Sequence, residues 1–266
     1  MIDAHCHLQF EAFDGEREAV ICRAADVGVE ALVIADYDGA RRGMLAELGK
    51  TPGVAICVGL HPWALAGMDE QAIGRELQQI GEALRKSEWA AVGECGLDFV
   101  RATDADARAE QQRVLEALLD LANVHALPVV LHAVRCHSTL HALLRQRGGC
   151  PSGGIMHAYS GSSRQVPLFL MHGLDISVGS RLIRNPEKLR AVVGQVPLDR
   201  LHLETDSPDG LVMADSDRAF TEPADVVHIV RAVAEALGLA PETLARRCAR
   251  NTRELFKLGE GRLGSA

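Results

Sequence analysis

The sequence predicts a (β/α)8 barrel, the TIM-barrel architecture, with an extra C-terminal helix. Short apolar runs alternate with longer amphipathic stretches along the whole chain. The apolar runs are continuous, as in parallel strands that are buried on both faces. The length of 266 residues also fits one such barrel, which typically takes about 250 residues. We therefore expect a single domain over residues 1–266.

Eight apolar runs are the expected strands of this barrel. They are Met1–Ala4, Glu30–Ala35, Val54–Gly59, Trp89–Gly93, Pro128–Leu131, Gly154–Met156, Leu174–Val178 and Leu201–Glu204. Helical periodicity is found in Glu16–Gly28, Arg41–Lys50, Glu70–Lys86, Ala107–His125, Ser138–Arg147, Arg164–His172, Pro186–Val193, Pro223–Leu237 and Pro241–Leu258. An open doubly wound sheet is the alternative, but its Gly-x-Gly-x-x-Gly turn is missing after the first strand. The acidic stretch Ser207–Glu222 is expected to be a loop on the catalytic face.

Composition and charge narrow the class of protein. Hydrophobic residues make up 47% and charged residues 24% of the chain, which is ordinary globular composition and excludes a disordered chain. The seven cysteines are odd in number and show no Cys-x-x-Cys pair, so we expect reduced thiols and a cytoplasmic protein. No apolar run is long enough for a membrane span. The net charge of −8 means that the overall field does not attract nucleic acid. If the substrate is a polyanion, bound metal and a few local arginines must supply the attraction.

Six of the eight expected strands end in a histidine or a carboxylate. Active-site residues of this architecture gather at that face of the barrel. They are His5 with His7, His61, Glu94, His132, His157 and Asp206. Because residues i and i+2 of an extended chain point to the same side, His5 and His7 can reach one metal while Cys6 points away. Imidazole and carboxylate groups suit Zn²⁺ or Mn²⁺, and carboxylates with water suit Mg²⁺.

A barrel hydrolase with two metals needs an anionic group between them. A carbamylated lysine is one solution, but no lysine lies at the end of an expected strand. The four lysines are Lys50, Lys86, Lys188 and Lys257. The bridge is therefore expected to be a carboxylate, and Glu94 stands at the end of a central strand.

Ordered motifs over nearly the whole chain resemble the TatD family of metal-dependent hydrolases. The motifs are Asp3-Ala4-His5-Cys6-His7-Leu8, Val58-Gly59-Leu60-His61-Pro62, Gly93-Glu94-Cys95-Gly96-Leu97-Asp98, Pro128-Val129-Val130-Leu131-His132, His157-Ala158-Tyr159-Ser160-Gly161 and Leu203-Glu204-Thr205-Asp206-Ser207-Pro208. Two departures are Phe99, where relatives usually carry tyrosine, and the longer spacing from His132 to Arg135.

The resemblance implies two divalent metal ions, such as Mg²⁺, Mn²⁺ or Zn²⁺. One metal would be held by His5, His7, Glu94 and Asp206, and the second by Glu94, His132 and His157. Known members of the family are metal-dependent DNases, several of them 3′→5′ exonucleases on single strands. The expected activity is thus phosphodiester hydrolysis of DNA by a metal-activated water. No obligate protein partner is evident, and the oligomeric state stays open.

Further roles are expected for residues around the metal ligands. Asp206 is expected to accept the proton of the attacking water. His61 is expected to bind the phosphate or protonate the leaving oxygen. Arg135 is expected to clamp a phosphate. Tyr159 is expected to stack on a base, although packing within the barrel explains it equally well.

Four other side chains complete the sequence-based expectations. Asp98 and Glu204 are expected to orient ligating histidines. His137 and His141, four residues apart, are expected on a solvated helix face.

Two other functions remain open from the sequence. The same ligands suit hydrolysis of a small phosphodiester, a lactone or an amide. A metal-binding protein without enzymatic activity is the third possibility.

Overall fold

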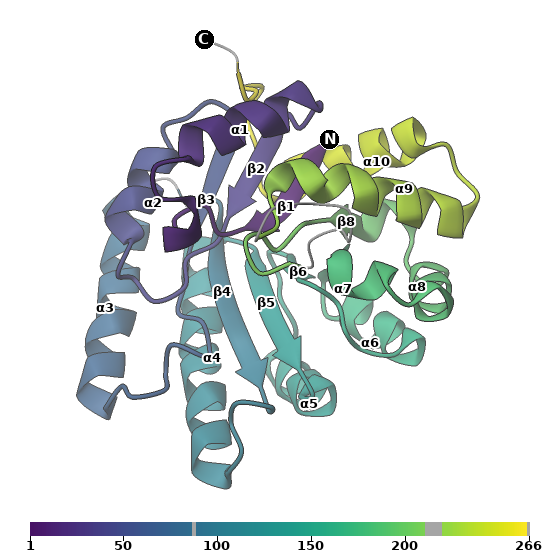
Figure 1. Ribbon diagram of the computed structural model, residues 1–266. Coiled ribbons are helices and arrows are strands. Elements are labelled where there is room, and N and C mark those ends of the chain that lie inside the picture. The colour runs from purple at the N-terminus through teal and green to yellow at the C-terminus, as the bar shows by residue number, and fades with distance from the viewer. Residues whose placement is uncertain (87–88, 211–219, 265–266) are drawn as a thin grey trace.

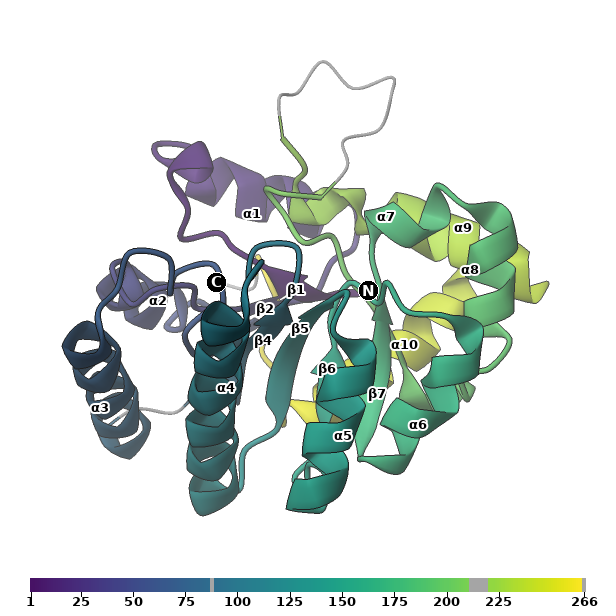
Figure 2. The same cartoon turned by 90° about the horizontal axis from the view of Figure 1, so that it is seen from below.

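The computed structural model describes residues 1–86, 89–210 and 220–264. Eight parallel strands are hydrogen-bonded in chain order, and helices lie on their outer side (Figures 1 and 2). The strands are β1 (Ile2–Cys6), β2 (Ala31–Ile34), β3 (Val54–Val58), β4 (Ala91–Asp98), β5 (Val129–Val134), β6 (Gly154–Met156), β7 (Leu174–Val178) and β8 (Leu201–Leu203). The predicted (β/α)8 barrel is therefore confirmed.

The helices follow the strands in the order that the sequence predicts, with one addition. They are α1 (Arg17–Asp26), α2 (Arg42–Leu48), α3 (Glu70–Lys86), α4 (Ala105–His125), α5 (His137–Arg147), α6 (Val166–Met171), α7 (Ser180–Ile183), α8 (Pro186–Val193), α9 (Val226–Leu237) and α10 (Pro241–Leu255). The short helix α7 was not predicted, because one turn shows no periodicity. No described helix combines the length and apolarity that crossing a bilayer requires.

Three strands continue beyond their predicted ends. β1, β4 and β5 include His5, Glu94 and His132, which the sequence placed just after the strands. Pairing continues there, for example between Gly96 and His132. Apolar runs mark only the part of a strand that is buried in the hydrophobic core. The polar residues at the mouth are buried too, but by one another.

The segment after β8 closes the barrel against β1. The amide of His7 donates to the carbonyl of Ser207 at 2.7 Å, and the amide of Asp206 donates to the carbonyl of His5 at 3.0 Å. The buried carboxylate of Asp3 accepts hydrogen bonds from the amide of Thr205 at 2.9 Å and from its hydroxyl at 2.5 Å. These bonds join parts of the chain that are about two hundred residues apart, and they bring Asp206 to the histidines of β1.

The loop predicted over Ser207–Glu222 lies partly outside the described residues, which omit 211–219. Its two ends are anchored. Ser207 pairs with Cys6 of β1. Phe220 packs against Phe13 with ring centroids 5.1 Å apart.

The barrel has two apolar layers. Small and branched residues fill its interior, where Phe256, just after α10, joins Val33, Cys57, Val130 and Ile155 in one buried cluster. Larger side chains, such as Leu and Ile from the other faces of the strands, pack beneath the helices. This arrangement holds the strand ends rigidly at the mouth, where a site built on them inherits that rigidity.

Glycine allows β4 to approach β5 closely at the mouth. Gly96 has φ +149, and an added Cβ would lie 2.0 Å from the carbonyl oxygen of His132. Gly93 has φ +155, and its Cβ would lie 2.6 Å from the side chain of Val130. The two glycines flank Glu94, so they set how near its strand lies to the histidine on β5.

We expect Gly96→Ala to destabilise the fold by about 2 kcal/mol or more, because the new methyl group collides with backbone and not with a movable side chain. Gly74→Ala is the matched control. Gly74 is exposed in α3 with nothing within 4 Å of an added Cβ, so alanine there should stabilise by about 0.5–1 kcal/mol. Urea denaturation followed by circular dichroism measures both. Equal stability of the two variants would contradict the steric argument.

Candidate metal centre

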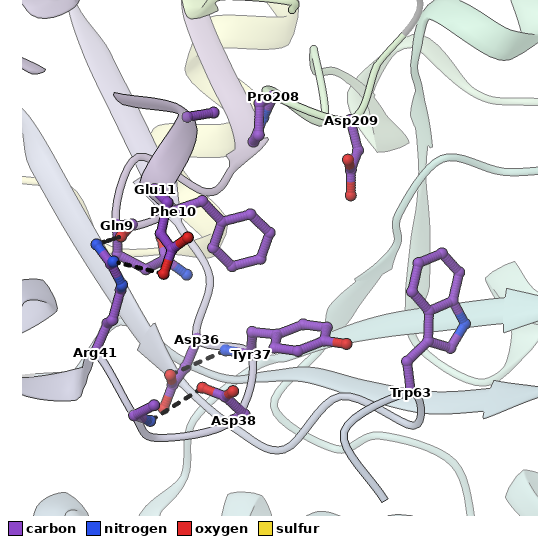
Figure 3. A pocket seen from close by; sticks show the side chains of 12 residues that line it. Gln9, Phe10, Glu11, Asp36, Tyr37, Asp38, Arg41, Trp63, Pro208 and Asp209 are labelled. Carbon is purple, nitrogen blue, oxygen red and sulfur yellow. Dashed lines mark hydrogen bonds and ion pairs between the residues drawn. The ribbon is translucent and has the colours of Figure 1, made fainter. Parts of the chain in front are cut away.

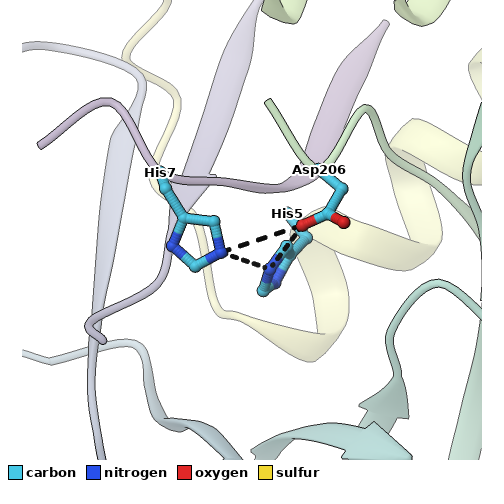
Figure 4. A group of neighbouring side chains, drawn as sticks. All are labelled: His5, His7 and Asp206. Carbon is cyan, nitrogen blue, oxygen red and sulfur yellow. Dashed lines mark hydrogen bonds and ion pairs between the residues drawn. The ribbon is translucent and has the colours of Figure 1, made fainter. Parts of the chain in front are cut away.

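One oxygen of Glu94 faces the histidines at the end of β1. Its Oε2 lies 3.2 Å from Nε2 of both His5 and His7. The Oδ1 of Asp206 lies 3.6 Å from Nε2 of His5 and 3.8 Å from Nε2 of His7. Figure 4 shows that His5, His7 and Asp206 point toward one another. Asp206 has φ 60, a strained left-handed conformation for a residue with a side chain.

The other oxygen of Glu94 faces three histidines, one within β5 and the other two shortly after the ends of β3 and β6. Its Oε1 lies 3.2 Å from Nε2 of His61, 2.9 Å from Nδ1 of His132 and 3.0 Å from Nε2 of His157. Each oxygen of this one buried carboxylate thus contacts a separate group of imidazoles. All six residues that were predicted as metal ligands converge here, and His61 lies beside them.

Two further carboxylates contact the far ring nitrogens of His132 and His157, the nitrogens that do not face Glu94. Nδ1 of His157 contacts Oε1 of Glu204 at 3.1 Å, and Nε2 of His132 contacts Oδ2 of Asp98 at 3.1 Å. A carboxylate only accepts hydrogen bonds, so each imidazole carries its proton on that far nitrogen. Asp98 and Glu204 thus contact the histidines that they were expected to orient; metal binding by these histidines stays a prediction.

The inner nitrogens of these imidazoles therefore present lone pairs. His7 behaves in the same way, because its Nδ1 donates to the carbonyl of Ala35 at 3.0 Å and leaves Nε2 as an acceptor. In the neutral state these lone pairs would face the oxygens of Glu94, which is repulsive. A divalent cation between them turns the repulsion into coordination, so this donor set fits a metal.

His61 differs from the other histidines of the cluster. The amide of Trp63 donates to its Nδ1 at 3.1 Å. The proton of neutral His61 must then lie on Nε2, which points at Glu94 and at Nδ1 of His132, 3.2 Å away. Burial lowers the pKa of His61 to about 4. His61 therefore presents a hydrogen-bond donor to the site, where its neighbours present acceptors.

The electrostatics of the cluster favour positive charge. Burial alone would raise the pKa of Glu94, but the imidazoles, His157 foremost, outweigh it and hold that pKa well below its ordinary value. Burial alone would lower the pKa of His157, but the carboxylates of Glu94 and Glu204 raise it well above the usual range. A site that draws protons so strongly also attracts metal cations.

A pocket of about 510 Å³ opens above the cluster and contains two arginines that sequence reasoning missed. They are Arg101, three residues after the end of β4, and Arg181, in the first turn of α7. Their position in the sequence could have identified them, because both arginines come shortly after the end of a strand and therefore lie on the catalytic face. Arg101 lies over the ring of Trp63 at 4.7 Å.

Aromatic side chains form one wall of this pocket. The chain is poor in aromatic residues, at 4%, yet Phe10, Tyr37 and Trp63 all line the pocket above the cluster. They also line an adjoining pocket of about 510 Å³ (Figure 3). Figure 3 shows the three rings and Asp209 around this opening.

Tyr159 and Arg135 lie away from the pocket above the cluster. Tyr159 is buried, its hydroxyl donates to the carbonyl of Ser162 at 2.8 Å, and its ring contacts Phe169. The structure gives this ring a packing role in place of the expected base stacking. Arg135 is exposed beside a neighbouring pocket.

The expectation that His137 lies on a solvated helix face is wrong. The side chain is buried, and its ring packs against Tyr159 and Phe169. The i, i+4 spacing with His141 does not reveal which face of α5 turns inward.

Comparison with known proteins agrees with this geometry. The model of a family described as TatD related DNase matches residues 2–257. The chain is 32% identical to an uncharacterized metal-dependent hydrolase, YjjV of Escherichia coli K12, over 97% of this chain and 98% of that one. It is 31% identical to a 3′-5′ ssDNA/RNA exonuclease TatD of Erwinia billingiae, over 97% of this chain and 99% of the relative.

Structural comparison leads to the same family. The crystal structure of YjjV, a TatD homologue from Escherichia coli K12, superposes with a TM-score of 0.85 over 97% of this chain and 98% of the other. Fold and sequence thus coincide over nearly the full length. The chain belongs to the TatD-related DNase family of metal-dependent hydrolases.

Proposed function

We propose that this chain is a single-domain exonuclease, over residues 1–266, that removes nucleotides from the 3′ end of single-stranded DNA. The observation that carries the proposal is Glu94, whose two oxygens face two separate groups of histidines. A carboxylate so placed suits two metal ions that act on one phosphodiester. Relatives named as 3′-5′ ssDNA/RNA exonucleases at 31% identity support the substrate class.

The proposed ligands follow the two groups around Glu94. The first metal would be held by His5, His7, Glu94 and Asp206, and the second by Glu94, His132 and His157. Divalent cations supply such a site with a nucleophilic water at neutral pH and with positive charge for the phosphoryl oxygens.

The protein side chains provide the remaining steps. The side chain of Asp206 is 17% exposed and borders the pocket. We propose that it accepts the proton as the water oxygen bonds to phosphorus. The bond from phosphorus to the 3′ oxygen of the shortened strand breaks, that oxygen takes a proton from solvent, and the released nucleotide keeps the phosphate. His61 donates a hydrogen bond from Nε2 to a phosphoryl oxygen. With its pKa near 4, it is neutral at pH 7 and acts as a donor, not as the acid for the leaving oxygen. Arg101 and Arg181 border the same space and offer planar donors to phosphate.

The aromatic wall supports a single-stranded substrate. Base stacking on aromatic rings needs bases that are not paired within a duplex. Phe10, Tyr37 and Trp63 together offer such surfaces at the edge of the metal centre. The carboxylate of Asp209 beside them repels phosphate but accepts hydrogen bonds from the amino groups of bases. The wall therefore suits a base better than a phosphate.

Glu94→Gln keeps the volume of the side chain and removes the charge, so we expect activity to fall by about a thousandfold or more. The assay uses metal-loaded protein and single-stranded DNA labelled at its 5′ end, with Mg²⁺, Mn²⁺ or EDTA. Glu235→Gln, at an exposed position of α9, is the control and should cleave like wild type. Near-normal cleavage by Glu94→Gln would refute the bridging role. A wild-type protein that leaves DNA intact would direct the search to small phosphodiesters, lactones and amides.

Metal loading should stabilise the fold, because it neutralises the buried charge of Glu94. A ligand at a hundred times its Kd adds about 2.7 kcal/mol, and for a chain of this size that corresponds to a rise in Tm of about 5–10 °C. Differential scanning calorimetry of chelated protein, before and after addition of Mn²⁺, measures the change. The rise should shrink in Glu94→Gln. An unchanged Tm in wild type would contradict a metal site at this cluster.

Tyr37→Ala should raise KM for single-stranded DNA by about tenfold, because a base loses one stacking surface. Tyr37→Phe retains the ring and should keep KM close to the wild-type value. Steady-state kinetics on a short oligonucleotide separate KM from kcat. A loss confined to kcat, or an equal loss in both variants, would show that Tyr37 does not bind the base.

A further inference from the structure

A third pocket of the catalytic face is basic. It has a volume of about 470 Å³ and is lined by Arg135, His137 and Lys188 among other residues, none of which is an aspartate or a glutamate. The protein as a whole carries a net charge of −8. The pocket above the metal cluster contains Glu94, Asp98, Asp206 and Asp209. Among the described residues, the lining of this pocket beside the metal centre thus carries positive charge and no carboxylate.

Among the described residues, neither Arg135 nor Lys188 forms an ion pair with a carboxylate. The Nζ of Lys188 donates to the carbonyl of Ser160 at 2.6 Å, which positions the amine and leaves its charge uncompensated. Arg135 has φ 52, a left-handed conformation that costs free energy for a residue with a side chain. Such strain, held by the surrounding structure, is a common feature of binding sites.

The pocket also contains a buried polar atom without a partner. His137 is 8% exposed, and its Nε2 has no hydrogen-bond partner in the described part of the chain. Burial, followed by the charge of Lys188, lowers the pKa of His137 to about 4. A nearby anion would offset both effects, because negative charge stabilises an imidazolium and a lysine amine alike.

The basic pocket adjoins the metal centre. Val134, at the end of β5, and Ser160, in the loop after β6, line both this pocket and the pocket above the cluster. A chain of linked phosphates that reaches the metals can therefore continue into it.

We propose that Arg135, Lys188 and His137 form a phosphate subsite that binds an uncleaved phosphate of the substrate strand, next to the one at the metals. The inference rests on the proposed nuclease function. Together with Arg101 and Arg181 above the metals, this subsite would attract a polyanion to an acidic protein. The aromatic wall receives a base, and the basic pocket receives the sugar-phosphate backbone.

The test compares an oligonucleotide with bis(p-nitrophenyl) phosphate, which contains a single phosphate. For Arg135→Ala and for Lys188→Ala, the ratio of kcat/KM on the oligonucleotide to that on the small diester should fall about tenfold, through KM. The slope of log KM against log salt should also decrease by about one. Arg145→Ala, at an exposed position in the last turn of α5, is the matched control and should leave the ratio unchanged.

A second arm identifies the phosphate. Oligonucleotides are prepared with one phosphate at a time replaced by an uncharged methylphosphonate. Replacement at the bound position should raise KM about tenfold in wild type and should have no further effect in Lys188→Ala, as coupled groups do in a double-mutant cycle. Additive effects at every position would overturn the subsite.

The outcomes separate the two proposals. If wild type cleaves the oligonucleotide and both variants match it, the subsite is refuted while the nuclease function stands. If the variants lose activity equally on both substrates, they act at the metal centre, and the separate subsite is again refuted. If wild type hydrolyses only the small diester, the nuclease function fails and the subsite fails with it.

Discussion

The structure depends on one buried negative charge, the carboxylate of Glu94. Its side chain is 2% exposed and is approached by five imidazoles within 3.2 Å. Leaving such a charge uncompensated costs several kcal/mol, so the site must hold positive charge whenever it is folded. The two glycines that flank this residue on β4 let its strand lie close enough to β5 for the contacts to form. The tight packing of the mouth and the affinity for cations have this single origin.

The catalytic face around Glu94 has an aromatic side and a basic side. Phe10, Tyr37 and Trp63 follow β1, β2 and β3, whereas Arg135 and Lys188 lie after β5 and within α8. The aromatic rings thus lie on one side of the metals, where Arg101 stacks on Trp63, and Arg135 and Lys188 lie on the other. A nucleotide has the same division between base and phosphate. Stacking and charge contacts do not distinguish one base edge from another, so the two proposed sites would bind a strand irrespective of its sequence.

Much of this site could be predicted because parallel strands end on one face. That rule alone brought His5, Glu94 and His157 together from distant parts of the chain. The pairing of Glu204 with His157 was predictable for a related reason, since a ligating imidazole needs a partner for its other nitrogen.

Other features depend on tertiary packing, which local patterns do not encode. The inward turn of His137 depends on how α5 rotates over the neighbouring rings. The choice of Tyr37 and not Tyr159 as a pocket-facing ring depends on loop geometry. Arg101 and Arg181 were missed because a position shortly after a strand indicates only that a residue lies near the catalytic face, not that its side chain enters the pocket. The tautomer of His61 became visible only once the amide of Trp63 was placed.

The closure of the barrel between its first and last strands also bears on how the protein is made. Five of the six proposed ligands lie within the first 157 residues, but Asp206 and the segment that holds it to β1 come later. A nascent chain still on the ribosome, or a proteolytic fragment that ends before β8, has an unpaired edge on β1 and an incomplete centre. The full set of proposed ligands therefore comes together only when the last strand has closed the barrel.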